Sequence, residues 1–283
     1  MCVARSLMKG IPSMIYDLQK ASVLKRISAW LLDFILLTIV ITGLTWGLAA
    51  AFGYYQNQSF IANINEEYDV KYFSEINGEG CSPENRKLTF NTNVMTAEKY
   101  EALSEDDRAY FDSVYDIYKT DERVNYSFAK EITVLLSAAS IAIILAYLGL
   151  EFFIPLKLGN GQTIGKKVFA IGVMQVNGVR ITGISLFARS MLGKCTIETM
   201  VPALIAIMIL RGAINIVGLL VLALIAIFEL ILIISTKTNS LIHDIFAFTV
   251  TVDMPSQMIF DSEEELIAYK KRIHAEAVEN AKY

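Results

Sequence analysis

"KRISAWLLDFILL", residues 25–37, begins the first long apolar run of the chain and places Asp33 inside it. The run lasts from about Ile27 to Phe52, and about 20 apolar residues suffice for a helix to cross a bilayer. An ionised aspartate within such a span costs about 2.5–3.5 kcal/mol on insertion scales. We therefore expect Asp33 to bind a proton or to find polar partners in a distant part of the chain.

Arg26 is the nearest cation to Asp33 in the sequence. The two residues share a helical face, but they lie about 10.5 Å apart along the axis. The Arg26 side chain also leans toward the helix N-terminus, away from Asp33, so direct pairing within the helix is not expected. The other candidate partners are Arg189, Lys166, Lys167 and the pair His243-Asp244.

The whole chain has the composition of a membrane protein. Of its 283 residues, 54% are hydrophobic and 19% are charged, against about 45–50% and 25% in soluble domains. A net charge of -4, with no basic run interleaved with aromatic residues, indicates no nucleic-acid partner. The three cysteines form no CxxC pair and predict neither a zinc site nor a disulfide framework. No sequence feature calls for a cofactor.

The apolar runs predict an all-α polytopic helical membrane protein with four spans. Its parts are a cytoplasmic arm with the first span (1–52), an extracytoplasmic insert (53–131), a second span (132–154), a basic cytoplasmic loop (155–194), a hydrophobic hairpin (195–236) and a closing cytoplasmic segment with a tail helix (237–283). A single helix over 195–236 would be about 63 Å long, twice the hydrocarbon thickness. Arg211-Gly212 is therefore expected to form a turn between spans at 196–210 and 213–235. A three-span alternative, with a buried or re-entrant stretch, remains open.

The distribution of Lys and Arg predicts the orientation. The N-terminal arm carries five cations against Asp17 alone: Arg5, Lys9, Lys20, Lys25 and Arg26. The loop 155–194 carries six cations and no acid: Lys157, Lys166, Lys167, Arg180, Arg189 and Lys194. The positive-inside rule places both segments in the cytoplasm. The segment 53–131, with 16 acids against 8 Lys and Arg, then lies outside, and four spans leave both termini cytoplasmic.

The extracytoplasmic insert is expected to be helical. Thr96 and Ser104 are plausible N-caps, and Tyr110, Tyr115 and Tyr118 recur near helical spacing. Two interpretations are open, because the tyrosines could contact a ligand or could pack the insert against itself.

The basic loop is expected to contain a small β-hairpin at roughly 168–182. The sequence there alternates and includes Asn177-Gly178, a strong short-range hairpin signal. An amphipathic helix that carries Arg189 and Lys194 is expected to follow and to lie at the membrane interface.

The stretch "GNGQTIGKK", residues 159–167, is expected to form a turn rather than a phosphate-binding loop. Its notable residues are Gly161, Thr163, Gly165, Lys166 and Lys167. A Walker A motif would need glycine at position 160 and Ser or Thr at position 167, where Asn and Lys stand. The lysines are expected to face lipid headgroups or acids.

Three further acids lie in or near the predicted spans. Glu151 and Glu198 are near span ends and are expected to reach the interface, whereas Glu229 lies deep in the last span and needs a buried partner or a proton. His243-Asp244 predicts no metal site, because the only other histidine is His274 in the tail. Asp244 is expected to cap a helix or to pair with the basic loop.

Three blocks of the chain resemble the RDD family of membrane proteins, which is named for an Arg and two Asp. They are roughly 20–40 with Arg26 and Asp33, 160–190 with a Gly-Thr-x-Gly-Lys loop and Arg189, and 240–252 with "HDIFAFTVTV". In this resemblance Arg26, Asp33 and Asp244 take the three naming positions. It implies an integral protein of a bacterial-type inner membrane, with ion transport suggested for the family. The long insert and the doubled final span depart from the family pattern.

Two functions follow from these residues. In the first, the chain is a membrane scaffold or accessory subunit held by a static network of Arg26, Asp33, Arg189 and Asp244. In the second, it is a small transporter that exchanges protons or monovalent cations through Asp33 and Glu229. Four spans make a thin pathway, so a transporter would need a homo-oligomer or other membrane subunits. No nucleophile–base pair, metal cluster or nucleotide loop predicts an enzyme.

Overall fold

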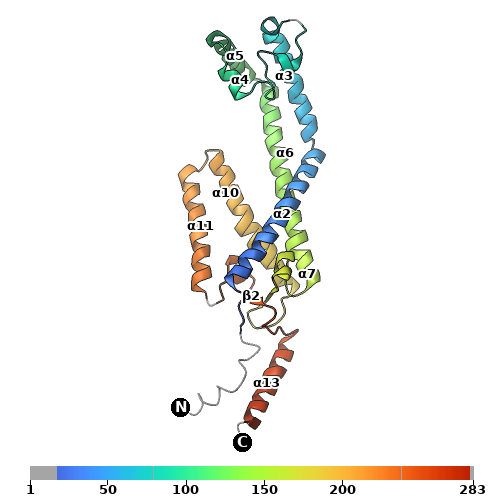
Figure 1. Cartoon of the computed structure of the whole chain (residues 1–283), viewed down its shortest axis with the longest axis vertical. Coiled ribbons are helices and arrows are strands. Elements are labelled where there is room, and N and C mark those ends of the chain that lie inside the picture. Colours follow the sequence, from blue (N-terminus) through green and yellow to red (C-terminus); the bar gives the residue numbers. More distant parts are fainter. Residues whose placement is uncertain (1–17, 79, 237, 281–283) are drawn as a thin grey trace. The chain divides into compact units, whose positions relative to one another are not determined.

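A computed structural model describes residues 18–78, 80–236 and 238–280. Arg5, Lys9 and Asp17, used above to predict the orientation, lie outside these ranges. The described chain divides into two compact units, one formed by the residues up to Ile41 and from Ala142 onward, the other by Thr42–Ile141. Figure 1 labels the helices and strands, and the charge network discussed below belongs to the first unit.

In the part of the chain that the structure describes, four helices are long and apolar enough to cross a membrane. They are α2 (Val23–Ala51), a continuous helix made of α6 (Glu122–Ala146), η2 (Tyr147–Phe153) and α7 (Ile154–Leu158), a second continuous helix made of α9 (Gly183–Phe187), η3 (Ala188–Met200) and α10 (Val201–Leu210), and α11 (Asn215–Ser235). The expected turn joins α10 to α11, with Gly212 in the left-handed region at φ 72°. The prediction of four membrane-capable helices is therefore confirmed.

The third of these helices differs from its prediction. The expected interfacial helix and the expected span at 196–210 form one helix, Gly183–Leu210. Arg189, expected on a helix that lies at the membrane interface, is only 3% exposed. The prediction of a separate interfacial helix is therefore wrong, because buried acceptors hold Arg189 inside the fold.

The segments η2 and η3 are π-helical. In η2 the N–H of Ile154 bonds the carbonyl of Gly149, and in η3 the N–H of Val201 bonds that of Thr196. Residues five apart are about 140° apart around an α-helix, whereas the i to i+5 ring of a π-helix places them nearly above one another. Arg189 and Lys194 thus come onto one side of η3.

The single sheet in the described residues pairs β1 (Ile171–Gln175) with β2 (Thr249–Asp253) in antiparallel register from Ile171↔Asp253 to Gln175↔Thr249. The expected turn at Asn177-Gly178 forms, but its return segment contributes only the bridge Met174↔Arg180. The predicted hairpin is therefore wrong in its partner strand. Pairing with β2 buries Val250 and Val252 against Met174, and a local hairpin would leave that apolar face exposed.

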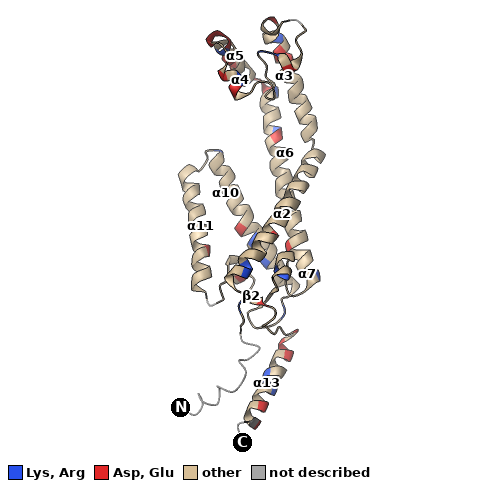
Figure 2. Ribbon diagram, viewed as in Figure 1, with Lys and Arg blue, Asp and Glu red and all other residues tan. Residues whose placement is uncertain are grey.

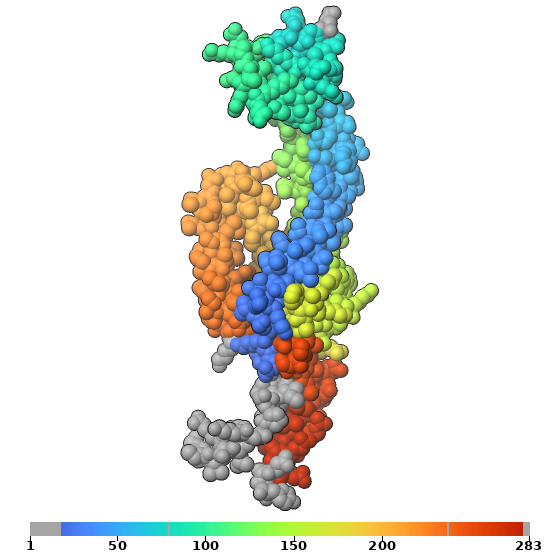
Figure 3. Space-filling view, viewed as in Figure 1, coloured from blue at the N-terminus to red at the C-terminus, as the bar shows by residue number. Residues whose placement is uncertain are grey.

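Two short helices and the start of α2 surround this sheet. The helix α8 (Ile164–Val168) precedes β1, and α12 (Ile242–Phe246) precedes β2. Lys25 at the start of α2 donates to Asp253 at 2.6 Å, and Figure 3 shows this end of α2 against the segment around β2. In Figure 2 the charged residues of this unit are concentrated in the segments near the sheet and along α13 (Glu263–Asn280), whereas α10 and α11 are mostly uncharged.

The second unit has its own core. Its elements are the second half of α2, α3 (Tyr54–Asn77), η1 (Pro83–Asn85), α4 (Ala97–Glu101), α5 (Glu105–Tyr118) and most of α6. Thr96 and Ser104 cap α4 and α5 as predicted. Phe73, Phe90 and Tyr118 are buried in an aromatic cluster, which supports the interpretation that the insert packs against itself.

Candidate functional site

Asp33 obtains its partners from the loop before α8. Its side chain is 8% exposed, and it accepts a hydrogen bond from Thr163 Oγ1 at 2.5 Å and another from the backbone N–H of Gly165 at 2.8 Å. The expected direct pairing with a cation or with His243-Asp244 is therefore wrong. The first N–H groups of a helix have no intrahelical acceptor, and Asp33 supplies one.

Gly165 allows this contact because it has no side chain. A Cβ at position 165 would lie 2.3 Å from the carbonyl oxygen of Ala29 and 2.9 Å from Cγ of Asp33. These distances are too short for any Cβ, so the loop reaches α2 only with glycine here. Gly161, at φ +57° and against Val173, serves the turn that leads into it.

Arg189 and Asp244 form a buried ion pair. Arg189 Nη1 donates to Asp244 Oδ1 and, at 2.8 Å, to Thr249 Oγ1, while Nη2 lies 3.4 Å from Thr251 Oγ1. Asp244 is 1% exposed. Thr249 and Thr251 are two residues apart on β2 and so point to one face of the strand. Pairing with the basic segment, as expected for Asp244, joins η3 to α12 and β2.

Arg26 also reaches this pair rather than Asp33. Its Nη1 donates to the carbonyl oxygen of Asn239 at 2.6 Å, and its Nη2 lies 3.6 Å from Asp244 Oδ2. Asp244 therefore receives cations from α2 and from η3. Burial alone would raise the pKa of Asp244, but the charges of Arg189, His243 and Arg26 outweigh it and hold this pKa at about 2.

Glu198, which was predicted to reach the interface, binds His243. The backbone N–H of His243 donates to Glu198 Oε1 at 2.9 Å, and the ring Nδ1 lies 2.8 Å from both carboxylate oxygens. Burial lowers the pKa of His243 well below 6.5, so the ring is neutral at pH 7. A proton on Nδ1, assigned from these contacts, donates to Glu198.

Glu151, for which the same prediction was made, is buried and paired. It is 4% exposed and accepts a hydrogen bond from Lys194 Nζ at 2.7 Å. Beside this pair, the Tyr147 hydroxyl lies 2.6 Å from Thr199 Oγ1. Both contacts join η2 to η3, so the two π-helical segments face each other with polar side chains between them.

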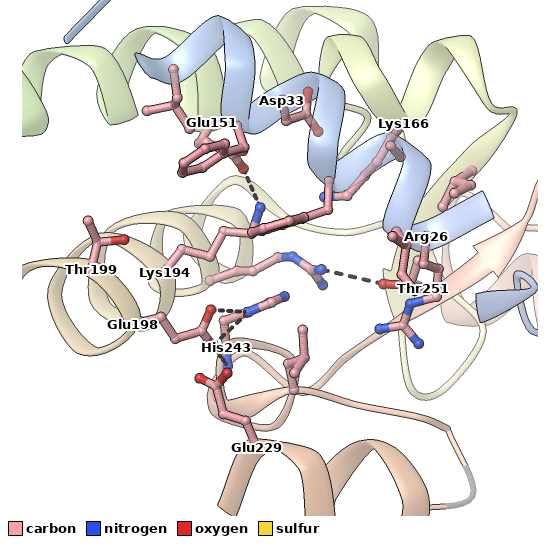
Figure 4. Close-up of a pocket in the computed structure, with 18 of the residues that line it drawn as sticks. Arg26, Asp33, Glu151, Lys166, Lys194, Glu198, Thr199, Glu229, His243 and Thr251 are labelled. Atoms are coloured by element: carbon pink, nitrogen blue, oxygen red, sulfur yellow. Dashed lines mark hydrogen bonds and ion pairs between the residues drawn. The ribbon is translucent and has the colours of Figure 1, made fainter. Parts of the chain in front are cut away.

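A cavity of about 630 Å³ opens beside this network (Figure 4). Its polar lining includes Arg26, Asp33, Glu151, Lys166, Arg189, Lys194, Glu198, Thr199, Glu229, Asn239, His243 and Thr251. Glu229 points into the cavity from α11. Among the described residues, no donor or cation contacts the Glu229 carboxylate, so the partner expected for it is not found there. Nor do three His, Cys, Asp or Glu side chains within the described ranges come together as metal ligands.

The two loop lysines have different surroundings. Lys166 lines the cavity, and burial, together with the charges of Lys194 and Arg189, lowers its pKa to about 7. Its Nζ has no hydrogen-bond acceptor among the residues that the structure describes. Lys167 is exposed and lies outside the cavity lining.

Several residues of this site were absent from the predicted set. They are Asn239, Thr249, Thr251, Tyr147 and Thr199. The Thr-x-Thr pattern of β2 was the one usable signal, because it places two hydroxyl groups on one face of a strand. The others depend on contacts between distant segments, which no local pattern specifies.

The described residues contain four membrane-capable helices, three of which contribute side chains to a buried charge network, and this arrangement defines a polytopic helical membrane protein. The model of the RDD family matches residues 20–248, most of the chain, so the protein belongs to the RDD family. Arg26, Asp33, Arg189 and Asp244 all lie within the match. No curated protein and no solved structure matches the chain significantly.

Proposed function

We propose that this RDD family protein is a membrane scaffold or accessory subunit without catalytic activity. The observation that carries the proposal is that the chain itself supplies partners for most of the buried charges. Asp33 is held by Thr163 and Gly165, Asp244 by Arg189, and Glu151 by Lys194. Together these contacts join α2, η2, α8, η3, α12 and β2.

Such a network favours a fixed arrangement of helices over a moving one. Removing one partner of a buried ion pair costs about 3–5 kcal/mol, so motions that separate Arg189 from Asp244 are expensive. We place the protein in a bacterial-type inner membrane with both termini in the cytoplasm, following the Lys and Arg of its arm and loop. Its partners would be other membrane subunits or a second copy of the chain.

One observation favours a second candidate, the exchange of protons or monovalent cations. Glu229 lies in a membrane-capable helix and lines the cavity, and no cation among the described residues neutralises it. Glu198, the other acid on that side of the cavity, is already held by His243. Acids inside spans commonly mark ion or proton pathways, so Glu229 would be the exchanging group.

A flux assay separates the two candidates. The purified full chain is placed in lipid vesicles that contain a pH-sensitive dye and is challenged with sodium or potassium. A scaffold moves no protons, and Asp33→Asn should lower the amount of folded protein because Thr163 and Gly165 lose their charged acceptor. Proton movement driven by either cation, lost in a normally folded Glu229→Gln variant, would refute the scaffold and establish the exchanger.

A further inference from the structure

The cavity beside the network has two chemically different walls. One is apolar and comes largely from α2, with Trp30, Phe34, Leu37 and Ile41. Trp30 and Phe34 stack with ring centroids 5.4 Å apart and remain 58% and 53% exposed. They belong to a membrane-capable helix, so hydrocarbon chains can reach this wall.

The other wall carries positive charge. Arg26 and Lys166 both line the cavity, on the side away from Glu198 and Glu229 (Figure 4). Arg26 is only partly neutralised, since its Nη2 is 3.6 Å from Asp244 Oδ2 and the other oxygen of the same carboxylate pairs with Arg189.

Within the described residues, the Lys166 ammonium group of the cavity has no hydrogen-bond acceptor. The charged groups that act on it are Lys194 and Arg189 from η3, Glu151 from η2 and Asp33 from α2. Each of these acids is already hydrogen-bonded, Glu151 by Lys194 and Asp33 by neutral donors. None of these acids accepts a hydrogen bond from the Lys166 ammonium group, which lines the cavity and is available to an anionic ligand.

We propose that this cavity binds a phospholipid with an anionic headgroup, whose phosphate lies between Lys166 and Arg26 and whose acyl chains lie along Trp30 and Phe34. A volume of about 630 Å³ holds a headgroup with the first part of its chains. Phosphate oxygens are strong acceptors for ammonium and guanidinium groups. Inorganic phosphate would leave the apolar wall unused, so the geometry favours a lipid. The proposal is independent of the scaffold and of the exchanger.

The two tryptophans of the chain make the site measurable. Trp30 lines the cavity and Trp46 does not, so Trp46→Phe leaves a single reporter in the full-length protein. This variant is reconstituted in phosphatidylcholine containing a fixed fraction of brominated lipid, either phosphatidylglycerol or phosphatidylcholine. Bromine quenches tryptophan fluorescence on contact. We expect phosphatidylglycerol to bind the site about tenfold more strongly than phosphatidylcholine, which is the effect of one or two charge-assisted hydrogen bonds.

Two lysine variants provide matched controls. Lys166→Gln removes the unpaired charge and keeps the backbone N–H that donates to Thr163, so it should bring the two lipids close to equal quenching. Lys167→Gln removes the same charge from the exposed neighbour and should retain the preference.

Three outcomes would overturn the proposal. The first is equal quenching of the single-tryptophan protein by both brominated lipids. This measurement does not depend on whether a lysine variant folds. The second is a loss of preference in Lys167→Gln that equals the loss in Lys166→Gln, since this indicates general surface attraction. The third is loss of the preference for phosphatidylglycerol when inorganic phosphate is added, but not when chloride is added at equal ionic strength. This result would show that the ligand is free phosphate.

Discussion

Substituting Gly165 by alanine tests how the loop before α8 is held against α2. The new Cβ would lie 2.3 Å from the Ala29 carbonyl oxygen and 2.9 Å from Cγ of Asp33. Neither is the flexible end of a long side chain, so the loop itself must move away. The backbone N–H of residue 165 then loses its 2.8 Å hydrogen bond to Asp33 Oδ1. The hydrogen bond from Thr163 to the same carboxylate weakens as well.

The expected loss of stability is the sum of known contributions. Overpacking costs about 1–3 kcal/mol, and loss of a hydrogen bond to a charged group costs about 1.5–3 kcal/mol. In the opposite direction, replacing glycine by alanine within a helix stabilises the folded state by up to about 1 kcal/mol. The net change in the free energy of unfolding should be about 2–5 kcal/mol, which lowers the midpoint of thermal unfolding by roughly 5–15 °C.

The measurement is thermal unfolding of the purified protein in detergent, with Gly183→Ala as the matched control. Gly183 also lies in the first turn of a helix, but its Cβ would meet only Leu156 Cδ1 at 3.8 Å. We expect this control to unfold within about 2 °C of the wild type, since surface substitutions usually change stability by less than 0.5 kcal/mol. Equal midpoints for both variants would refute the argument that the missing side chain of Gly165 holds the loop on Asp33.

Other contacts of the network support three further predictions. Arg189→Met should destabilise the protein by about 3–5 kcal/mol, because it leaves the buried charge of Asp244 uncompensated. Adding Asp244→Leu to the same chain removes that charge and should recover more than half of the lost stability. Thermal unfolding of the single and double variants measures both effects. Ionised Asp244 has a pKa of about 2 against an ordinary 3.8, so its stabilisation of about 2 kcal/mol is present above pH 4 and is lost as the pH falls toward 2. The difference in unfolding midpoint between wild type and Asp244→Asn should therefore be constant from pH 7 to 5 and shrink below pH 4. Tyr147→Phe should cost about 0.5–1.5 kcal/mol through its lost bond to Thr199, and Thr199→Val should add little in that background; additive losses would contradict a shared bond.

Local patterns in the sequence predicted much of the architecture. Four apolar runs and the Arg211-Gly212 turn predicted the membrane-capable helices, and the caps Thr96 and Ser104 were read from local patterns. Asp33 within an apolar run also required a distant polar partner. Each of these inferences depends on residues within one or two helical turns of each other, which a sequence displays directly.

The identity of the partners was decided only by the tertiary structure. Asp33 meets Gly165, 132 positions away, because the absence of a side chain there lets the loop touch α2. The π-helical winding of η2 and η3 turns Glu151 and Lys194 toward each other, although their positions in the sequence suggested span ends. β1 pairs with a strand more than 70 residues away rather than with its neighbour. Contacts of this kind depend on which backbones approach in space, and residue type alone does not specify that approach.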